Sequence, residues 1–276
     1  MSSSSPPKTQ LRALGFCGAD DSVHPNMLAL IVHAFPFVEF GVLFRPDKEG
    51  QPRYATAEWV ECLKQVAAKS QPRMKLAAHF CESRVNQVLR GDDSFLLTLK
   101  GTFQRVQINA TAVNGVDMSV LESDKIGETL KAFAALIRRN RNNFEFILQK
   151  NEETLPLWKG LLDLDSEETG PPGSLPTNVS MLVDESKGTG VVSSTPWPTP
   201  PDTYPIGYAG GIGPHNIAKV LGDIIEAGSG KSVWIDMESK LRSKKNDKDV
   251  FDLDKCYEVI DAVCAAGLHS PPDYLL

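Results

Sequence analysis

The sequence lacks long hydrophobic runs, an excess of basic residues and paired cysteine motifs. No uninterrupted apolar stretch approaches the roughly 20 residues that a membrane helix needs, so we expect no membrane partner. Lysine and arginine number 29 against 35 aspartates and glutamates, a formal net charge of −6. Binding to nucleic acid phosphates calls for a surplus of positive charge, so we expect no nucleic acid partner. The five cysteines lack CxxC spacing and predict neither a disulfide framework nor a zinc site.

The first residues are polar and carry no hydrophobic stretch like that of a secretory signal. We therefore expect a cytoplasmic protein. Residues 1–10 are predicted to form a disordered tail, and residues 11–276 one domain. The length of 276 residues suits either two medium domains or one barrel of about 250 residues.

Short apolar runs alternate with helical patterns along the rest of the chain. The predicted strands are 11–17, 37–44, 75–81, 105–109, 144–149, 179–184, 206–209 and 233–237. Apolar strands of this kind are typical of parallel sheets that are buried on both faces. Eight strand-then-helix units in this length favour an α/β fold, a closed (β/α)8 TIM barrel, over an open doubly wound sheet. We expect residues 95–99 to be extended and the basic residues 240–248 to be a solvated loop.

In such a barrel, active sites lie at the carboxyl ends of the strands. Cys17 ends the first predicted strand and Asp184 the sixth, which suggests a base and an acid across the barrel mouth. Taken alone, the cysteine could equally be a small buried hydrophobe and the aspartate a helix cap. Gln107 and Asn109 on the fourth strand and Asp236 on the eighth are predicted to contact the substrate.

Glycines and polar residues follow the last two strands. Gly210 and Gly211 precede a predicted helix, and Ser239 and Lys240 follow the eighth strand. Exposed backbone N–H groups near a helix start commonly form a phosphate site there, although a glycine turn at the barrel rim is the alternative.

These motifs together resemble the phosphoribosylanthranilate isomerases. That family's K-I-C-G, G-F-x-F and S-P-R-Y are similar to residues 15–18 (GFCG), 41–44 (GVLF) and 51–54 (QPRY). Residues 106–109 are similar to its V-Q-L-H, and residues 184–190 to its aspartate followed by G-G-T-G. Residues 209–217 are similar to its A-G-G-L-N-P-E-N-V, and residues 236–242 to its D-V-S-S-G-V-E. The likeness runs collinearly from about residue 11 to residue 265.

The resemblance implies a barrel that catalyses an Amadori rearrangement of a phosphoribosylamine in tryptophan biosynthesis, without metal or cofactor. Asp184 would protonate the ring oxygen and Cys17 would remove a proton from the adjacent carbon. Arg53 would hold the anthranilate carboxylate. The phosphate would lie among Gly188, Gly190, Gly210, Gly211, Ser239 and Lys240.

Several positions depart from the family pattern. The lysine two residues before the cysteine is Gly15, the histidine of V-Q-L-H is Asn109, and the closing glutamate is Arg242. These changes leave open a barrel enzyme that acts on another sugar phosphate, or a non-catalytic phosphate-binding barrel. The expected partner is a small phosphorylated sugar, bound by a monomer or homodimer.

Overall fold

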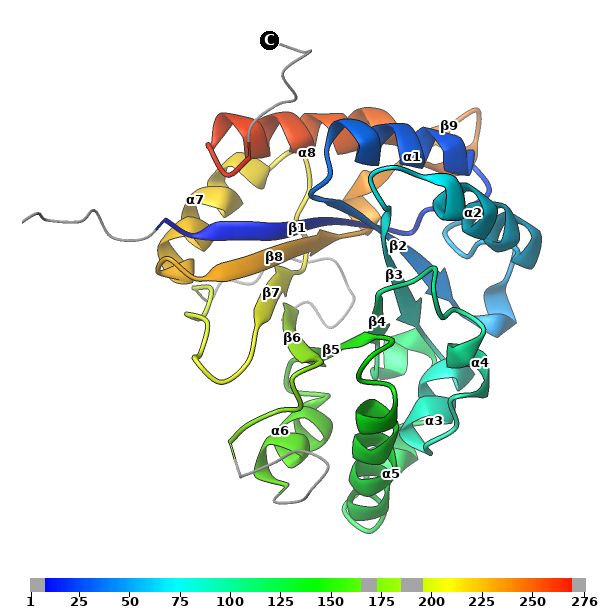
Figure 1. Cartoon of the computed structure of the whole chain (residues 1–276), viewed down its shortest axis with the longest axis vertical. Coiled ribbons are helices and arrows are strands. Elements are labelled where there is room, and N and C mark those ends of the chain that lie inside the picture. Colours follow the sequence, from blue (N-terminus) through cyan, green and yellow to red (C-terminus); the bar gives the residue numbers. More distant parts are fainter. Residues whose placement is uncertain (1–7, 165–172, 185–195, 270–276) are drawn as a thin grey trace, which may run out of the picture.

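The chain folds into the predicted closed parallel barrel (Figure 1). The computed structural model describes residues 8–164, 173–184 and 196–269. Each strand pairs in parallel with the next, and β1 pairs with β8 to close the ring. The strands are β1 (Gln10–Cys17), β2 (Val38–Phe44), β3 (Lys75–Phe80), β4 (Arg105–Ile108), β5 (Glu145–Lys150), β6 (Val179–Asp184), β7 (Ile206–Ala209) and β8 (Ser232–Met237).

Helices cover the outer face of the ring. They are α1 (Pro25–Ala34), α2 (Ala57–Lys69), α3 (Ser83–Leu89), α4 (Ser94–Leu97), α5 (Ile126–Arg139), α6 (Leu155–Asp163), α7 (Ile217–Gly228) and α8 (Leu253–Ala265). The hydroxyl of Thr56 accepts a hydrogen bond from the Trp59 N–H and caps the start of α2. Within the described ranges, no helix is long and apolar enough to span a bilayer.

Side chains alternate along each strand between the helix-covered face and the barrel interior. In β4, Val106 and Ile108 join the main apolar cluster beneath the helices. Their neighbours Arg105 and Gln107 are also buried, and they point into the barrel interior. The interior combines such polar groups with a small apolar cluster of Ala13, Ile147, Leu182, Ala209 and Trp234.

Ion pairs fill the lower end of the barrel, where the strands begin. The buried Arg105 guanidinium lies 2.8 Å from Glu39 and 3.3 Å from Glu145. Arg12 also pairs with Glu145, and the two arginines flank the Trp234 ring at 4.4 Å from its centroid. Side chains of opposite charge therefore pair with each other and fill this end of the barrel.

The predicted tail and the prediction for residues 95–99 differ from the structure. β1 begins at Gln10, and Thr9 is buried with its hydroxyl donating to the Ile225 carbonyl, so the predicted tail is too long by two residues. Residues 1–7 lie outside the described part of the chain. The extended prediction for residues 95–99 is wrong, because Phe95 and Leu97 belong to the short helix α4, where the Phe95 ring packs on Phe44 and Phe80.

The expectation of a solvated loop at residues 240–248 is also wrong. After the 3-10 turn Ser239–Leu241, strands β9 (Arg242–Lys245) and β10 (Lys248–Phe251) form an antiparallel hairpin. The charge of Arg242 is buried rather than solvated, because Asp20 and Asp249 neutralise it at 2.7 Å and 2.9 Å. Paired in this way, a basic residue can anchor the hairpin against the barrel.

Candidate active site at the barrel mouth

A cavity of about 250 Å3 opens at the carboxyl ends of the strands. It is the place where barrels of this type carry their chemistry. Nine of the predicted site residues line it: Arg53, Gln107, Asn109, Asp184, Gly210, Gly211, Asp236, Ser239 and Lys240. Cys17 is not among the lining residues. Gly188 and Gly190 lie outside the described residues.

The loops after β7 and β8 form one side of this cavity. Gly210 and Gly211 both have positive φ angles, 107° and 65°, in the turn that leads to α7. The Asn216 side chain holds this turn, donating to the Gly211 carbonyl at 3.1 Å and accepting from the Gly213 N–H at 2.9 Å. Lys240 is exposed on the opposing loop, so the glycine turn and a cation face the same space. Such an arrangement suits an anion.

Three carboxyl groups line the cavity. The Asp184 carboxylate accepts a hydrogen bond from the Gln149 amide at 3.2 Å. Burial raises the pKa of Asp236 well above its usual value, and the carboxylates of Glu39 and Glu238 raise it further. Burial also raises the pKa of Glu238, against the opposing effect of Arg53. At these two positions the carboxylate therefore takes up a proton more readily than an ordinary carboxylate does.

The place of Asp236 depends on a glycine in the adjacent strand. A Cβ atom at Gly15 would lie 2.3 Å from Asp236 Oδ1. Gly15 pairs with Asp236 in the β1–β8 register and stands where the isomerase family has a lysine. Arg105 on β4 favours the charged form of the aspartate, but burial outweighs it.

Cys17 lies below the cavity, against His79. Its sulfur is 3.2 Å from His79 Nδ1, and the imidazole, not the thiol, lines the cavity. Burial raises the pKa of the Cys17 thiol well above its usual range, and Glu238 and Asp236 raise it further. Burial lowers the pKa of His79 to about 3. The pair is therefore neutral, a thiol beside an uncharged imidazole.

The amides of β4 form a short hydrogen-bonded chain beside the histidine. Gln107 Nε2 donates to Asn109 Oδ1 at 2.8 Å, and Asn109 Nδ2 lies 3.5 Å from the Cys81 sulfur. The asparagine at the position of the family histidine thus contacts another cysteine. Gln107 Oε1 is buried and has no hydrogen-bond partner among the described residues.

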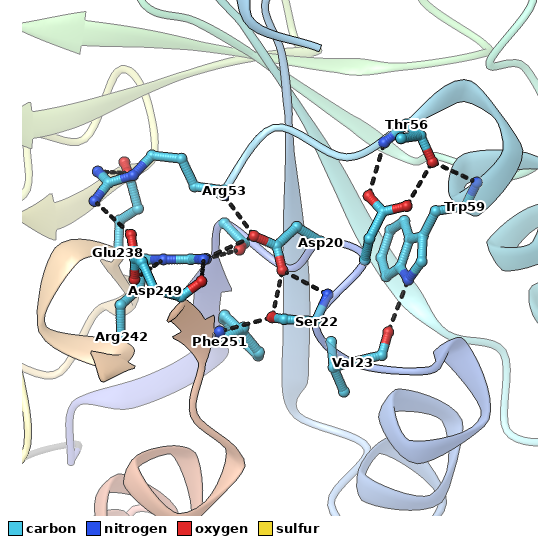
Figure 2. Close-up of polar contacts among 12 residues, drawn as sticks. Asp20, Ser22, Val23, Arg53, Thr56, Trp59, Glu238, Arg242, Asp249 and Phe251 are labelled. Carbon is cyan, nitrogen blue, oxygen red and sulfur yellow. Dashed lines mark hydrogen bonds and ion pairs between the residues drawn. The ribbon is translucent and has the colours of Figure 1, made fainter. Parts of the chain in front are cut away.

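Arg53 is fixed at the mouth by a network of acidic groups (Figure 2). Its backbone has a left-handed φ of 73°, and its N–H donates to Asp20 Oδ2 at 2.5 Å. The same carboxylate oxygen accepts from Arg242 at 2.7 Å. The Arg53 guanidinium lies 2.8 Å from Glu238 and 3.9 Å from Asp249 of the hairpin. The residue expected to bind a substrate carboxylate therefore already has two carboxylate neighbours.

Sequence reasoning did not identify His79, Gln149 and Glu238 as site residues. His79 and Gln149 stand at inward positions of their strands, so a period-two reading of each strand would have found them. Glu238 could have been found from the sequence, because it stands where the family motif has a serine. Among the described residues, no group of three or more His, Cys, Asp or Glu side chains could hold a metal ion.

Comparisons with known proteins identify no family. No family model matches the chain, and no curated protein is significantly similar. Among solved structures, a truncated 3-deoxy-D-arabino-heptulosonate 7-phosphate synthase from Thermotoga maritima is 9% identical, with a TM-score of 0.46 over 97% of this chain and 92% of the other. A structure described as native KDPGal is 11% identical, with a TM-score of 0.47 over 96% and 100%. At these scores the fold assignment rests on the strand pairing itself.

Proposed function

We propose that the protein is an isomerase that binds a phosphorylated sugar in the barrel mouth and converts an aldose into a ketose. The substrate proposed is an N-phosphoribosylated aromatic amine of the anthranilate type. The observation that carries the proposal is the cavity itself, in which Asp184, Glu238 and a glycine turn with a facing lysine line one space.

The phosphate is proposed to lie between Gly210–Gly211 and Ser239–Lys240. Consecutive positive φ angles turn backbone N–H groups toward one side, and glycine leaves no Cβ to keep an anion away. Lys240, whose side chain packs beside Gly213, supplies the opposite charge in the same cavity. Anchored there, the sugar would extend toward the carboxyl groups of β6 and β8.

The reaction needs one proton donor and one proton acceptor. Asp184 is proposed to donate a proton to the ring oxygen while the C1–O bond breaks and a C1=N iminium forms. The acceptor removes the proton from C2, giving an enolamine. Loss of the C2 hydroxyl proton and protonation of C1 then give the ketone.

We assign the acceptor role to Glu238 rather than to Cys17, which the family resemblance implies. Glu238 lines the cavity and its side chain is 32% exposed, whereas Cys17 is 1% exposed and lies against His79. A carboxylate whose pKa is raised accepts a proton more readily than an ordinary one. A buried thiol whose pKa is raised supplies little thiolate.

The ion pairs of Arg53 favour a second candidate function. This is an aldose–ketose isomerase that acts on a phosphopentose without an aromatic carboxylate. Glu238 and Asp249 already neutralise the guanidinium that would bind such a carboxylate. A substrate that lacks the carboxylate leaves this ion pair intact.

The test is turnover of N-(5′-phosphoribosyl)anthranilate, followed by chromatographic separation of the aldose and ketose forms, with ribose 5-phosphate assayed in parallel. Saturable conversion of the first supports the main proposal, and conversion of ribose 5-phosphate alone supports the second. Stabilisation by inorganic phosphate with no turnover of either would instead identify a binding protein.

Two variants decide the proton acceptor. Glu238→Gln should reduce kcat by about 100-fold to 10,000-fold, the usual contribution of a general base, whereas Cys17→Ser should retain most of the activity. The reverse result would return the role to the thiol. Both variants should keep the thermal shift caused by phosphate. Lys240→Ala should lose that shift, and Lys244→Ala, an exposed lysine of β9, should keep it.

A further inference from the structure

A second cavity, of about 220 Å3, lies outside the barrel between the β2 loop and helices α2, α3 and α4. Its lining residues include Phe44, Arg45, Tyr54, Val60, Arg84 and Phe95. We call it the lateral groove. The proposed reaction uses none of its residues.

The floor of the groove is aromatic. The rings of Phe44 and Phe95 lie 5.4 Å apart in an edge-to-face arrangement, and both are partly exposed. Val60 and Leu99 complete the floor with buried aliphatic side chains. Such a floor suits a flat apolar ring, which can add an aromatic contact of the kind already present.

One cation of the groove has no carboxylate partner. The guanidinium of Arg84 lies flat over the Phe95 ring, 3.6 Å from its centroid, and donates to the Gln87 amide oxygen at 3.0 Å. In the described part of the chain, no carboxylate lies within 4 Å of it. The other lining cations are paired, Arg45 with Asp47 and Lys64 with Glu61.

The acidic residues of the groove are also engaged. Glu49 accepts a hydrogen bond from the Ala57 N–H at 2.9 Å at the start of α2, and Glu61 pairs with Lys64 at 3.5 Å. The lining holds three cations and two carboxylates, and Asp47, which pairs with Arg45, balances the third cation. The Arg84 guanidinium lies at one end of the aromatic floor, and Glu49, Glu82 and Asp92 act on it without direct contact.

A wall of three side chains separates the groove from the active-site cavity. Leu43, Arg45 and Tyr54 line both spaces. Arg45 is held by Asp47 at 2.9 Å and by the Val113 carbonyl at 3.4 Å, so the wall is fixed from the side of the β4 loop. The two spaces are therefore adjacent but distinct.

We propose that the lateral groove is a binding site for a small planar aromatic carboxylate. The ring lies on Phe44 and Phe95, and the carboxylate pairs with Arg84 by charge-assisted hydrogen bonds. This site is separate from the sugar phosphate site and does not depend on the proposed isomerase activity.

The test is calorimetric titration of the full chain with 2-naphthoate and with 2-naphthamide, which keeps the ring and removes the charge. Naphthoate should bind about tenfold more tightly than the amide, a difference of about 1.4 kcal/mol. Arg84→Met should abolish that preference and bind both ligands equally. Lys64→Met, which removes a cation already paired with Glu61, should preserve it.

A competition experiment locates the ligand. Saturating inorganic phosphate should leave the naphthoate affinity unchanged, because phosphate occupies the barrel mouth. Competition between the two would place naphthoate in the active-site cavity and overturn the proposal. Equal affinity of the wild-type protein for naphthoate and naphthamide, or for naphthoate in wild-type and Arg84→Met proteins, would also overturn it.

Discussion

The lower end and the mouth of the barrel both contain buried charge, but they compensate it differently. At the lower end, Arg105 lies between Glu39 and Glu145. Burial alone would raise the pKa of Glu145, but Arg105 and Arg12 outweigh it and lower the pKa to about 2. At the mouth, burial and neighbouring carboxylates raise the pKa values of Asp236 and Glu238.

Within one ring of strands, the lower end of the barrel therefore serves stability and the mouth serves function. Paired charges at the lower end close the barrel and leave no group free to react. Carboxyl groups at the mouth lie close together, which lowers the stability of the fold. In an enzyme, the binding of a substrate offsets this cost. This division agrees with the general rule that the carboxyl ends of barrel strands carry the chemistry.

The largest effect is expected from Asp184→Asn at the mouth. Loss of the proton donor should reduce turnover of N-(5′-phosphoribosyl)anthranilate by about 100-fold to 10,000-fold. Steady-state kinetics measures this loss, and the phosphate-induced thermal shift should persist as the control for folding. Wild-type kcat in this variant would remove Asp184 from the reaction.

Arg105→Met at the lower end should destabilise the fold by about 3–5 kcal/mol, because it removes the arginine that neutralises the buried Glu39 and leaves Glu145 with Arg12 alone as its ion-pair partner. Denaturant unfolding measures the change. The matched control is Lys159→Met, which removes an exposed cation paired with Asp163 on α6 and should cost less than about 0.5 kcal/mol. Equal losses in the two variants would contradict the idea of a compensated lower end.

A smaller effect is expected in the pH dependence of stability. The folded protein holds a proton on Asp236 above the pH at which the unfolded chain releases it, so stability falls as pH rises through that window. Asp236→Asn should remove this part of the loss, about 1.4 kcal/mol for each unit of the pKa shift. Unfolding measured from pH 4 to pH 8 tests the slope, and an unchanged slope would exclude a raised pKa.

Glu145 should behave in the opposite way. Its folded pKa of about 2 lies below the ordinary value, so its contribution is present near neutrality and is lost as the pH falls toward 2. In Glu145→Gln, unfolding measured between pH 5 and pH 2 should show a weaker dependence on pH. A steeper dependence would mean that Arg105 and Arg12 do not hold the carboxylate charged.

The barrel could be predicted because each strand is a short, predominantly apolar run, and most of the site because glycines and charged residues follow those runs. Position along the chain does not show how deeply a side chain is buried, however. Cys17 ends its strand as predicted, yet Gly41 leaves room for His79 to lie over it, since a Cβ there would be 2.8 Å from His79 Nε2. The burial of Arg242 was likewise not predictable, because its partner Asp20 lies in a distant segment of the chain.

The central claim is that arginines lower the pKa of Glu145 at the lower end of the barrel, whereas burial raises the pKa values of Asp236 and Glu238 at its mouth. The most direct test is a carbon-13 NMR titration of the glutamate side-chain carboxyl groups, with Glu145 and Glu238 assigned from their glutamine variants. The account predicts that Glu238 titrates above the ordinary value of about 4.3 and Glu145 near 2. Titration of Glu238 at or below the midpoint of Glu145 would contradict it.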